Sequence, residues 1–117
     1  NTGNIQIEQY GTLGQDNPII LNLSTDNVIK NFNFCIEYSK HIIYIRTNDE
    51  FRRVDNCFYI DADLNEADKG FIINLKYNFF DKIDNNDSIK ITFFDEYSVP
   101  FSQNLRKTAK SEYIIKN

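Results

Sequence analysis

Few residues in this sequence could support catalysis, and none of them stands at a catalytic spacing. His41 is the only histidine, so a Ser-His-Asp or Cys-His arrangement would have to be built around it. It falls in a predicted hairpin turn, where a solvated side chain is the simpler interpretation. The motifs GxSxG and HExxH are absent, and the four scattered glycines form no phosphate-binding loop. We therefore expect no enzymatic activity.

Two acidic clusters have the oxygen ligands of a metal site but not its full pattern. The run DADLNEAD (Asp61–Asp68) lacks the central glycine and terminal glutamate of an EF-hand loop, and DKIDNND (Asp81–Asp87) is similarly incomplete. Asp and Asn are common in turns for backbone reasons, so the composition favours ordinary turns. We expect no metal and no cofactor, and leave metal binding by Asp61–Asp68 open.

The composition is that of one folded domain. A chain of 117 residues is typical of a single domain (1–117), and 41% hydrophobic with 15% aromatic residues is enough for a core. The net charge of -4 argues against nucleic acid, whose binders need a basic face. No apolar run is long enough to span a bilayer, and the start lacks a signal-peptide pattern. Because the chain begins at Asn1 without Met, we expect a piece excised from a longer chain.

The two cysteines do not form a recognisable motif. Cys35 and Cys57 are too far apart in sequence for a CxxC site, and two cysteines make no disulfide scaffold. The sequence favours two partly buried free thiols in a reducing compartment over a single bridge.

Apolar and polar residues alternate along most of the chain, which is typical of half-buried strands. The predicted strands are residues 4–10, 19–24, 31–38, 42–47, 57–64, 71–80, 88–96 and 112–117. Side chains predicted to face the core are Ile5, Ile7, Ile19, Leu21, Leu23, Phe32, Phe34, Ile36, Tyr38, Ile43, Ile45, Phe71, Ile73, Leu75, Tyr77, Phe79, Ile89, Ile91 and Phe93. Short strands separated by turns predict an all-β fold, an Ig-like, jelly-roll-like antiparallel sandwich with little helix.

The connections add three expectations. A short turn at 39–41 predicts that 32–38 and 42–47 are antiparallel neighbours. Residues 65–70 are predicted to form a loop or one helical turn, and 105–110 a short helix.

The outward faces of these strands carry the candidate site. Planar amides, charged groups and a phenol ring suit sugar hydroxyls and C–H surfaces, whereas the simpler interpretation is a solvated sheet face. The candidate carbohydrate-binding residues are Asn33, Glu37, Tyr44, Arg46, Asn74, Lys76, Lys90 and Thr92.

The order of these segments resembles one family. A strand at NTGNIQI, the central FNFCIEYSKHIIYIRTND, the Gly-led GFIINLKYNFF, a turn with SIKITFFDE, and the closing AKSEYIIKN are similar to the C-terminal carbohydrate-binding domain of the ATP-binding subunit of O-antigen polysaccharide ABC exporters. The chain departs from that family at 45–48, where Ile-Arg-Thr-Asn replaces Gly-x-Asn-Thr, and in its hairpin turn, which lacks the usual glycine.

This resemblance implies a function. Such domains are Ig-like sandwiches that bind the exported polysaccharide, often at its modified non-reducing end, and couple binding to export. It implies a cytoplasmic location at the inner face of the inner membrane, the ATPase and membrane subunits of an exporter as partners, and a homodimer. Arg46 and Lys76 could then bind an anionic cap such as a phosphate.

Two other classes stay open. One is an extracellular cohesin-like or Ig-like protein-interaction or adhesion module, although its extra strands are not expected to fit in this length. An exposed apolar strip would serve it, with Ile42, Ile72 and Phe94 as candidates. A Cys35–Cys57 bridge would favour this class. The other is a purely structural domain whose outer face is simply solvated.

Overall fold

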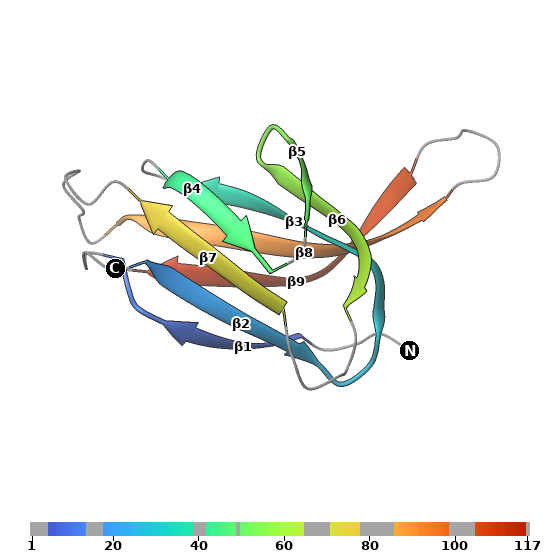
Figure 1. Cartoon of the computed structure of the whole chain (residues 1–117), viewed down its shortest axis with the longest axis horizontal. Coiled ribbons are helices and arrows are strands. Elements are labelled where there is room, and N and C mark those ends of the chain that lie inside the picture. Colours follow the sequence, from blue (N-terminus) through green and yellow to red (C-terminus); the bar gives the residue numbers. More distant parts are fainter. Residues whose placement is uncertain are drawn as a thin grey trace.

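The protein is an all-β sandwich, as the alternation predicts. The computed structural model describes residues 5–13, 18–38, 42–48, 50–64, 71–77, 86–98 and 105–116. Two antiparallel sheets pack face to face in this part of the chain, and no helix occurs in it (Figure 1). None of the described segments is a helix long and apolar enough to cross a membrane.

The described residues form nine strands in two sheets. Sheet A has the order β1-β2-β7-β4, and sheet B has the order β5-β6-β3-β8-β9. The strands are β1 (Ile5–Tyr10), β2 (Ile19–Thr25), β3 (Ile29–Tyr38), β4 (Ile42–Thr47), β5 (Arg52–Val54), β6 (Cys57–Leu64), β7 (Phe71–Tyr77), β8 (Ser88–Ser98) and β9 (Leu105–Lys116).

The core lies between the sheets and follows the predicted alternation. The inward residues of β2, β7 and β8 are almost fully buried, and Phe32, Phe34 and Ile36 of β3 are 1% exposed or less. Aromatic rings join the sheets at the centre, because Phe32 of sheet B lies 5.4 Å from Phe71 of sheet A, ring centroid to ring centroid. The side chains of Tyr38, Ile43, Tyr77 and Phe79, also predicted to face inward, lie outside the described residues.

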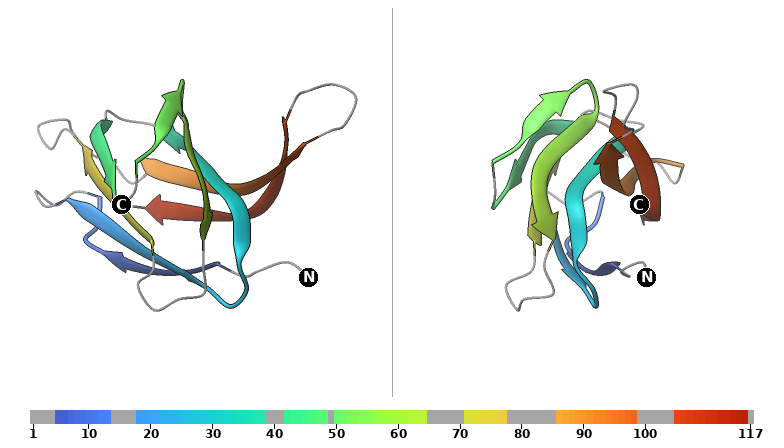
Figure 2. Two further views of the ribbon diagram at one scale, coloured as in Figure 1. Left: turned by 45° about the vertical axis from the view of Figure 1, so that its right-hand side comes forward. Right: turned by 90° about the vertical axis from the view of Figure 1, so that its right-hand side faces the viewer.

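One side-chain hydrogen bond joins the two sheets along one edge of the sandwich. The hydroxyl of Tyr113 on β9 donates to the amide oxygen of Gln9 on β1 at 2.7 Å. These strands are the adjacent outer strands of the two layers, as two turned views show (Figure 2). The contact therefore ties the sheets together without involving either outer face.

The predicted hairpin of 32–38 with 42–47 is wrong. β3 is central in sheet B between β6 and β8, whereas β4 is an edge strand of sheet A that pairs only with β7. The connection therefore passes from one sheet to the other. A short turn brings the ends of two strands close, but it does not decide whether they hydrogen-bond or pack across the core.

Two connecting segments contain strand that the alternation does not predict. The charged stretch before Cys57 contains strand β5, which pairs with β6 across a turn where Asp55 has a φ of 56°. Residues 105–110, predicted to be a helix, are the first half of β9 and pair with β8. β8 and β9 continue past the other strands as a two-stranded ribbon, so β8 supplies hydrogen bonds that favour strand over helix (Figure 1). The predictions for the 39–41 turn with His41, and for 65–70 and 81–85, lie outside the described residues.

Candidate functional site

The predicted site residues divide between the two outer faces of the sandwich. Arg46, Asn74 and Lys76 lie on sheet A, and Tyr44 of β4 is opposite Lys76 in the register, although its side chain is not described. Glu37, Lys90 and Thr92 lie on sheet B. Because the hydrophobic core separates the faces, these residues cannot form one site.

The outer face of sheet A mixes amides, basic groups and apolar side chains. Its central row runs across all four strands, from Tyr10 through Ile20 and Asn74 to Arg46. The next row contains Glu8, Asn22 and Ile72. Tyr10 and Ile72 are 55% and 38% exposed, so apolar surface lies beside the polar groups.

An open pocket of about 240 Å³ lies on this face between β4 and β7. Arg46, Thr47, Asn48, Ile72 and Asn74 line it. The amide oxygen of Asn48 accepts a hydrogen bond from the backbone N–H of Ile72 at 3.1 Å, which fixes this side chain at the end of β4. Arg46 and Asn74, two of the predicted site residues, therefore lie side by side in this pocket.

Two asparagines on this face have an unsatisfied oxygen. The Oδ1 atoms of Asn22 and Asn74 are buried and have no hydrogen-bond partner. The two residues lie on neighbouring strands in diagonal register, since Asn22 is opposite Ile72 and Ile20 is opposite Asn74. A buried polar atom without a partner costs stability, so such a pair in a native sheet calls for an explanation.

Of the corresponding polar residues of sheet B, Lys90 has an ion-pair partner, and Glu37 and Thr92 lie beside it on the same face. The ammonium of Lys90 lies 3.2 Å from a carboxylate oxygen of Glu112 on β9, and Glu37 is the register partner of Lys90 on the other side. Thr92 is opposite Cys35. These are the contacts of an ordinary solvated sheet face.

Asn33 was predicted to be exposed, and this is wrong because it is fully buried. The β3–β6 register shifts around Phe32 and Asn33, which leaves extra β6 residues without a backbone partner. The Asn33 Oδ1 accepts from the Ile60 N–H at 3.1 Å, and its Nδ2 donates to the Asn31 carbonyl at 2.7 Å. Both ends of the amide therefore stabilise the bulge and are not available to a ligand.

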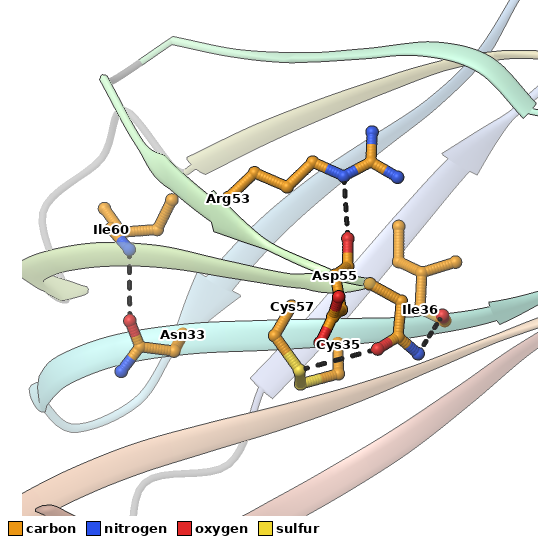
Figure 3. The surroundings of a disulfide bond; sticks show 8 residues. Asn33, Cys35, Ile36, Arg53, Asp55, Cys57 and Ile60 are labelled. Atoms are coloured by element: carbon orange, nitrogen blue, oxygen red, sulfur yellow. Dashed lines mark hydrogen bonds between the residues drawn. A yellow bond between two sulfur atoms is a disulfide. The ribbon is translucent and has the colours of Figure 1, made fainter.

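The two cysteines form a disulfide, which corrects the expectation of free thiols. Cys35 and Cys57 are direct register partners on β3 and β6, with their Cα atoms 4.0 Å apart (Figure 3). The neighbouring Asn56 strengthens the same junction, because its Nδ2 donates to the Ile36 carbonyl at 2.8 Å and its own carbonyl accepts from the Ile36 N–H at 2.8 Å. The bridge thus stands on the outer face of sheet B.

A second pocket, of about 250 Å³, lies at the β5 edge of sheet B. Glu50, Phe51, Arg52, Tyr59 and Ile60 line it, and none of these was predicted. The Arg52 guanidinium lies 4.9 Å from the centroid of the Tyr59 ring. A cation therefore already covers the aromatic face that a sugar would need.

Sequence reasoning missed two amides of the sheet A face. Asn22 stands between Leu21 and Leu23 and interrupts the apolar run at the start of β2, so this amide could have been noticed. Asn48 lies just past β4, where alternation no longer assigns a face. Within the described parts of the chain, no group of three or more His, Cys, Asp or Glu residues could hold a metal ion.

Comparison with protein-family models, with curated proteins and with solved structures finds no match to this chain.

Proposed function

We propose that this chain is a non-catalytic binding domain that binds carbohydrate on the outer face of sheet A. The pocket between β4 and β7 carries this proposal, because a guanidinium and two amides surround the exposed Ile72. Sugars are bound by planar polar groups that hydrogen-bond their hydroxyls and by apolar surface that contacts their C–H groups. The volume suits one sugar ring rather than a larger organic ligand.

The chemistry of the pocket supports binding rather than catalysis. The described lining residues include neither a carboxylate nor an imidazole, the groups that most often transfer protons in active sites. Arginine and amide side chains instead orient a ligand through fixed hydrogen bonds.

The disulfide favours the extracellular alternative over a cytoplasmic exporter domain. A bridge between two partly exposed cysteines persists in an oxidising environment and is reduced in a bacterial cytoplasm. We therefore place the domain outside the cytoplasm in this proposal. The ATPase and membrane subunits and the homodimer stay predictions.

A second candidate is a protein-interaction module on the same face. Tyr10 and Ile72 are exposed there, with Ile20 between their strands. Protein interfaces have aromatic and aliphatic side chains at their centre, so a protein surface could cover this row. The predicted apolar strip itself is not formed, since Ile72 and Phe94 lie on opposite faces and the Ile42 side chain is not described.

A glycan array separates the two candidates. The labelled domain is applied to neutral and acidic glycans beside Arg46→Ala and Asn74→Ala, with Lys90→Ala from sheet B as the matched control. We expect binding by the wild type and the control and a loss in both pocket variants. Binding to no glycan contradicts the carbohydrate proposal and leaves the protein-interaction module. Equal binding by the pocket variants places the ligand elsewhere.

A further inference from the structure

The pocket on sheet A presents hydrogen-bond donors and few acceptors. The Oδ1 of Asn48 is occupied by the Ile72 N–H, which leaves its Nδ2 for a ligand. The Oδ1 of Asn74 is buried, so its Nδ2 is the exposed end of that amide. The Arg46 guanidinium is exposed and has no hydrogen-bond or ion-pair partner among the described residues. Three neighbouring side chains therefore present N–H groups to the same space.

The outward charged residues of the two strands that border the pocket are basic, although the whole chain is negative. Lys76 follows Asn74 on the same face of β7, and Arg46 is the register partner of Asn74. Glu8 is the only carboxylate among the outward residues of the four sheet A strands, and β2 lies between β1 and β7. The net charge of -4 would repel a densely charged polyanion, so the pocket fits a single anionic group better.

The combination of donors and positive charge defines the kind of sugar. We propose, resting on the carbohydrate-binding function above, that the ligand is a sugar with a carboxylate. The fork of the Arg46 guanidinium binds the two carboxylate oxygens, and the amide groups of Asn48 and Asn74 donate to the carboxylate or an adjacent hydroxyl oxygen. The sugar ring then rests on the exposed side chain of Ile72.

Esterification tests this specificity, because it removes the charge and keeps the sugar. Trigalacturonic acid and sialyllactose are each titrated calorimetrically beside their methyl esters. We expect at least one acid to bind about tenfold or more tightly than its ester, and the difference to shrink as salt is raised. Equal affinity of acid and ester overturns the inference but leaves the carbohydrate function intact. If the array shows binding to neutral glycans while neither acid binds, the inference is likewise overturned and the carbohydrate function is kept. If no glycan binds at all, the carbohydrate function itself is overturned.

Two variants locate the carboxylate. Arg46→Lys keeps the charge but loses the fork, so we expect weaker acid binding with little change for the ester. Asn74→Asp places a negative charge in the pocket, and we expect it to abolish acid binding. Lys90→Ala, a basic residue of the opposite face, is the control that should bind like the wild type. Acid binding that survives both pocket variants overturns the assignment.

Discussion

The two outer faces of the sandwich carry similar polar residues, but individual residues on them differ in the partners they have within the domain. On sheet B, Lys90 pairs with Glu112, and both ends of the Asn33 amide are hydrogen-bonded to backbone groups of the bulge. On sheet A, Arg46 has no partner among the described residues, and the oxygen of Asn74 is buried without one. Lys90 and Asn33 therefore have partners within the domain, whereas Arg46 and the Asn74 oxygen, on the face where we propose a ligand, have none in the described part of the chain.

Asn33 and Asn74 show why residue type alone does not identify a site. Both follow an apolar residue in an alternating strand, and both were predicted to face outward. The register shift on β3 takes Asn33 out of solvent, whereas Asn74 lies in a regular part of the β2–β7–β4 pairing, beside a pocket. Backbone pairing therefore decides whether an amide stabilises the fold or remains available.

The largest effect should come from removing the bridge on sheet B. Cys35 and Cys57 are 22 residues apart, and opening a loop of this length should lower the free energy of unfolding by about 3 kcal/mol. The measurement is urea unfolding of the double Cys→Ser variant, with reduced wild type as the second sample. The sheet A ligand should still bind the folded variant. An unfolding midpoint insensitive to both changes would contradict a structural role for the bridge.

Asn33→Ala should be the next most damaging change. It leaves the Ile60 N–H and the Asn31 carbonyl without their side-chain partners, and a loss of about 2 kcal/mol is expected. Asn74→Ala on sheet A is the matched control and should change stability little. If thermal or urea unfolding shows the same loss of stability in Asn33→Ala and Asn74→Ala, the distinction between these two amides is contradicted.

Asn74→Leu should separate binding from stability. Leucine removes a buried oxygen that has no partner, so stability should stay the same or rise by up to about 1 kcal/mol. Affinity for the sheet A ligand should fall about tenfold, because the amide donor is lost. Both are measured on one sample, by unfolding and by calorimetry. A strongly destabilised variant would mean that the Asn74 oxygen is bonded after all.

Tyr113→Phe should weaken the connection between the sheets without altering either face. It removes the hydrogen bond to Gln9 and should cost about 1 kcal/mol of stability. Ligand affinity should be unchanged, since neither residue lines the pocket. A loss of affinity in calorimetry would show that the pocket on sheet A depends on the hydrogen bond between Tyr113 and Gln9.

The smallest effect is expected for Lys90→Ala. The pair with Glu112 is largely exposed, so its loss should cost less than about 0.5 kcal/mol. Glycan binding should be unchanged. A drop in affinity comparable to that of Arg46→Ala would move the site to sheet B.

Alternation predicted the strands and the core well, but not the sheets to which they belong. Ile19, Leu21, Phe34 and Ile91 are buried as expected, because a period of two follows directly from strand geometry. Nothing in residues 39–41 indicates that the chain changes sheet there. The helix predicted at 105–110 failed because pairing with β8 outweighs local propensity.

The positions of the candidate residues on the sheets were predicted in part. Arg46, Asn74 and Lys76 are on one face as expected, since the β4–β7 register is regular from Tyr44 to Thr47, past the shift between Ile42 and Tyr44. Glu37, Lys90 and Thr92 lie on the opposite face, because β3 and β8 belong to sheet B and not to the sheet of β4. The bridge and the bulge depend on the β3–β6 register, which no local pattern in the sequence specifies.

The most direct test of the sheet A site is an amide NMR titration of the isotope-labelled domain. A mixture of neutral and carboxylate-bearing oligosaccharides at millimolar concentration is added to the oxidised protein. We predict saturable shifts that cluster at Arg46, Asn48, Ile72 and Asn74 and leave Glu37, Lys90 and Thr92 unchanged. Shifts confined to β3 and β8, or none at all, would contradict carbohydrate binding on sheet A.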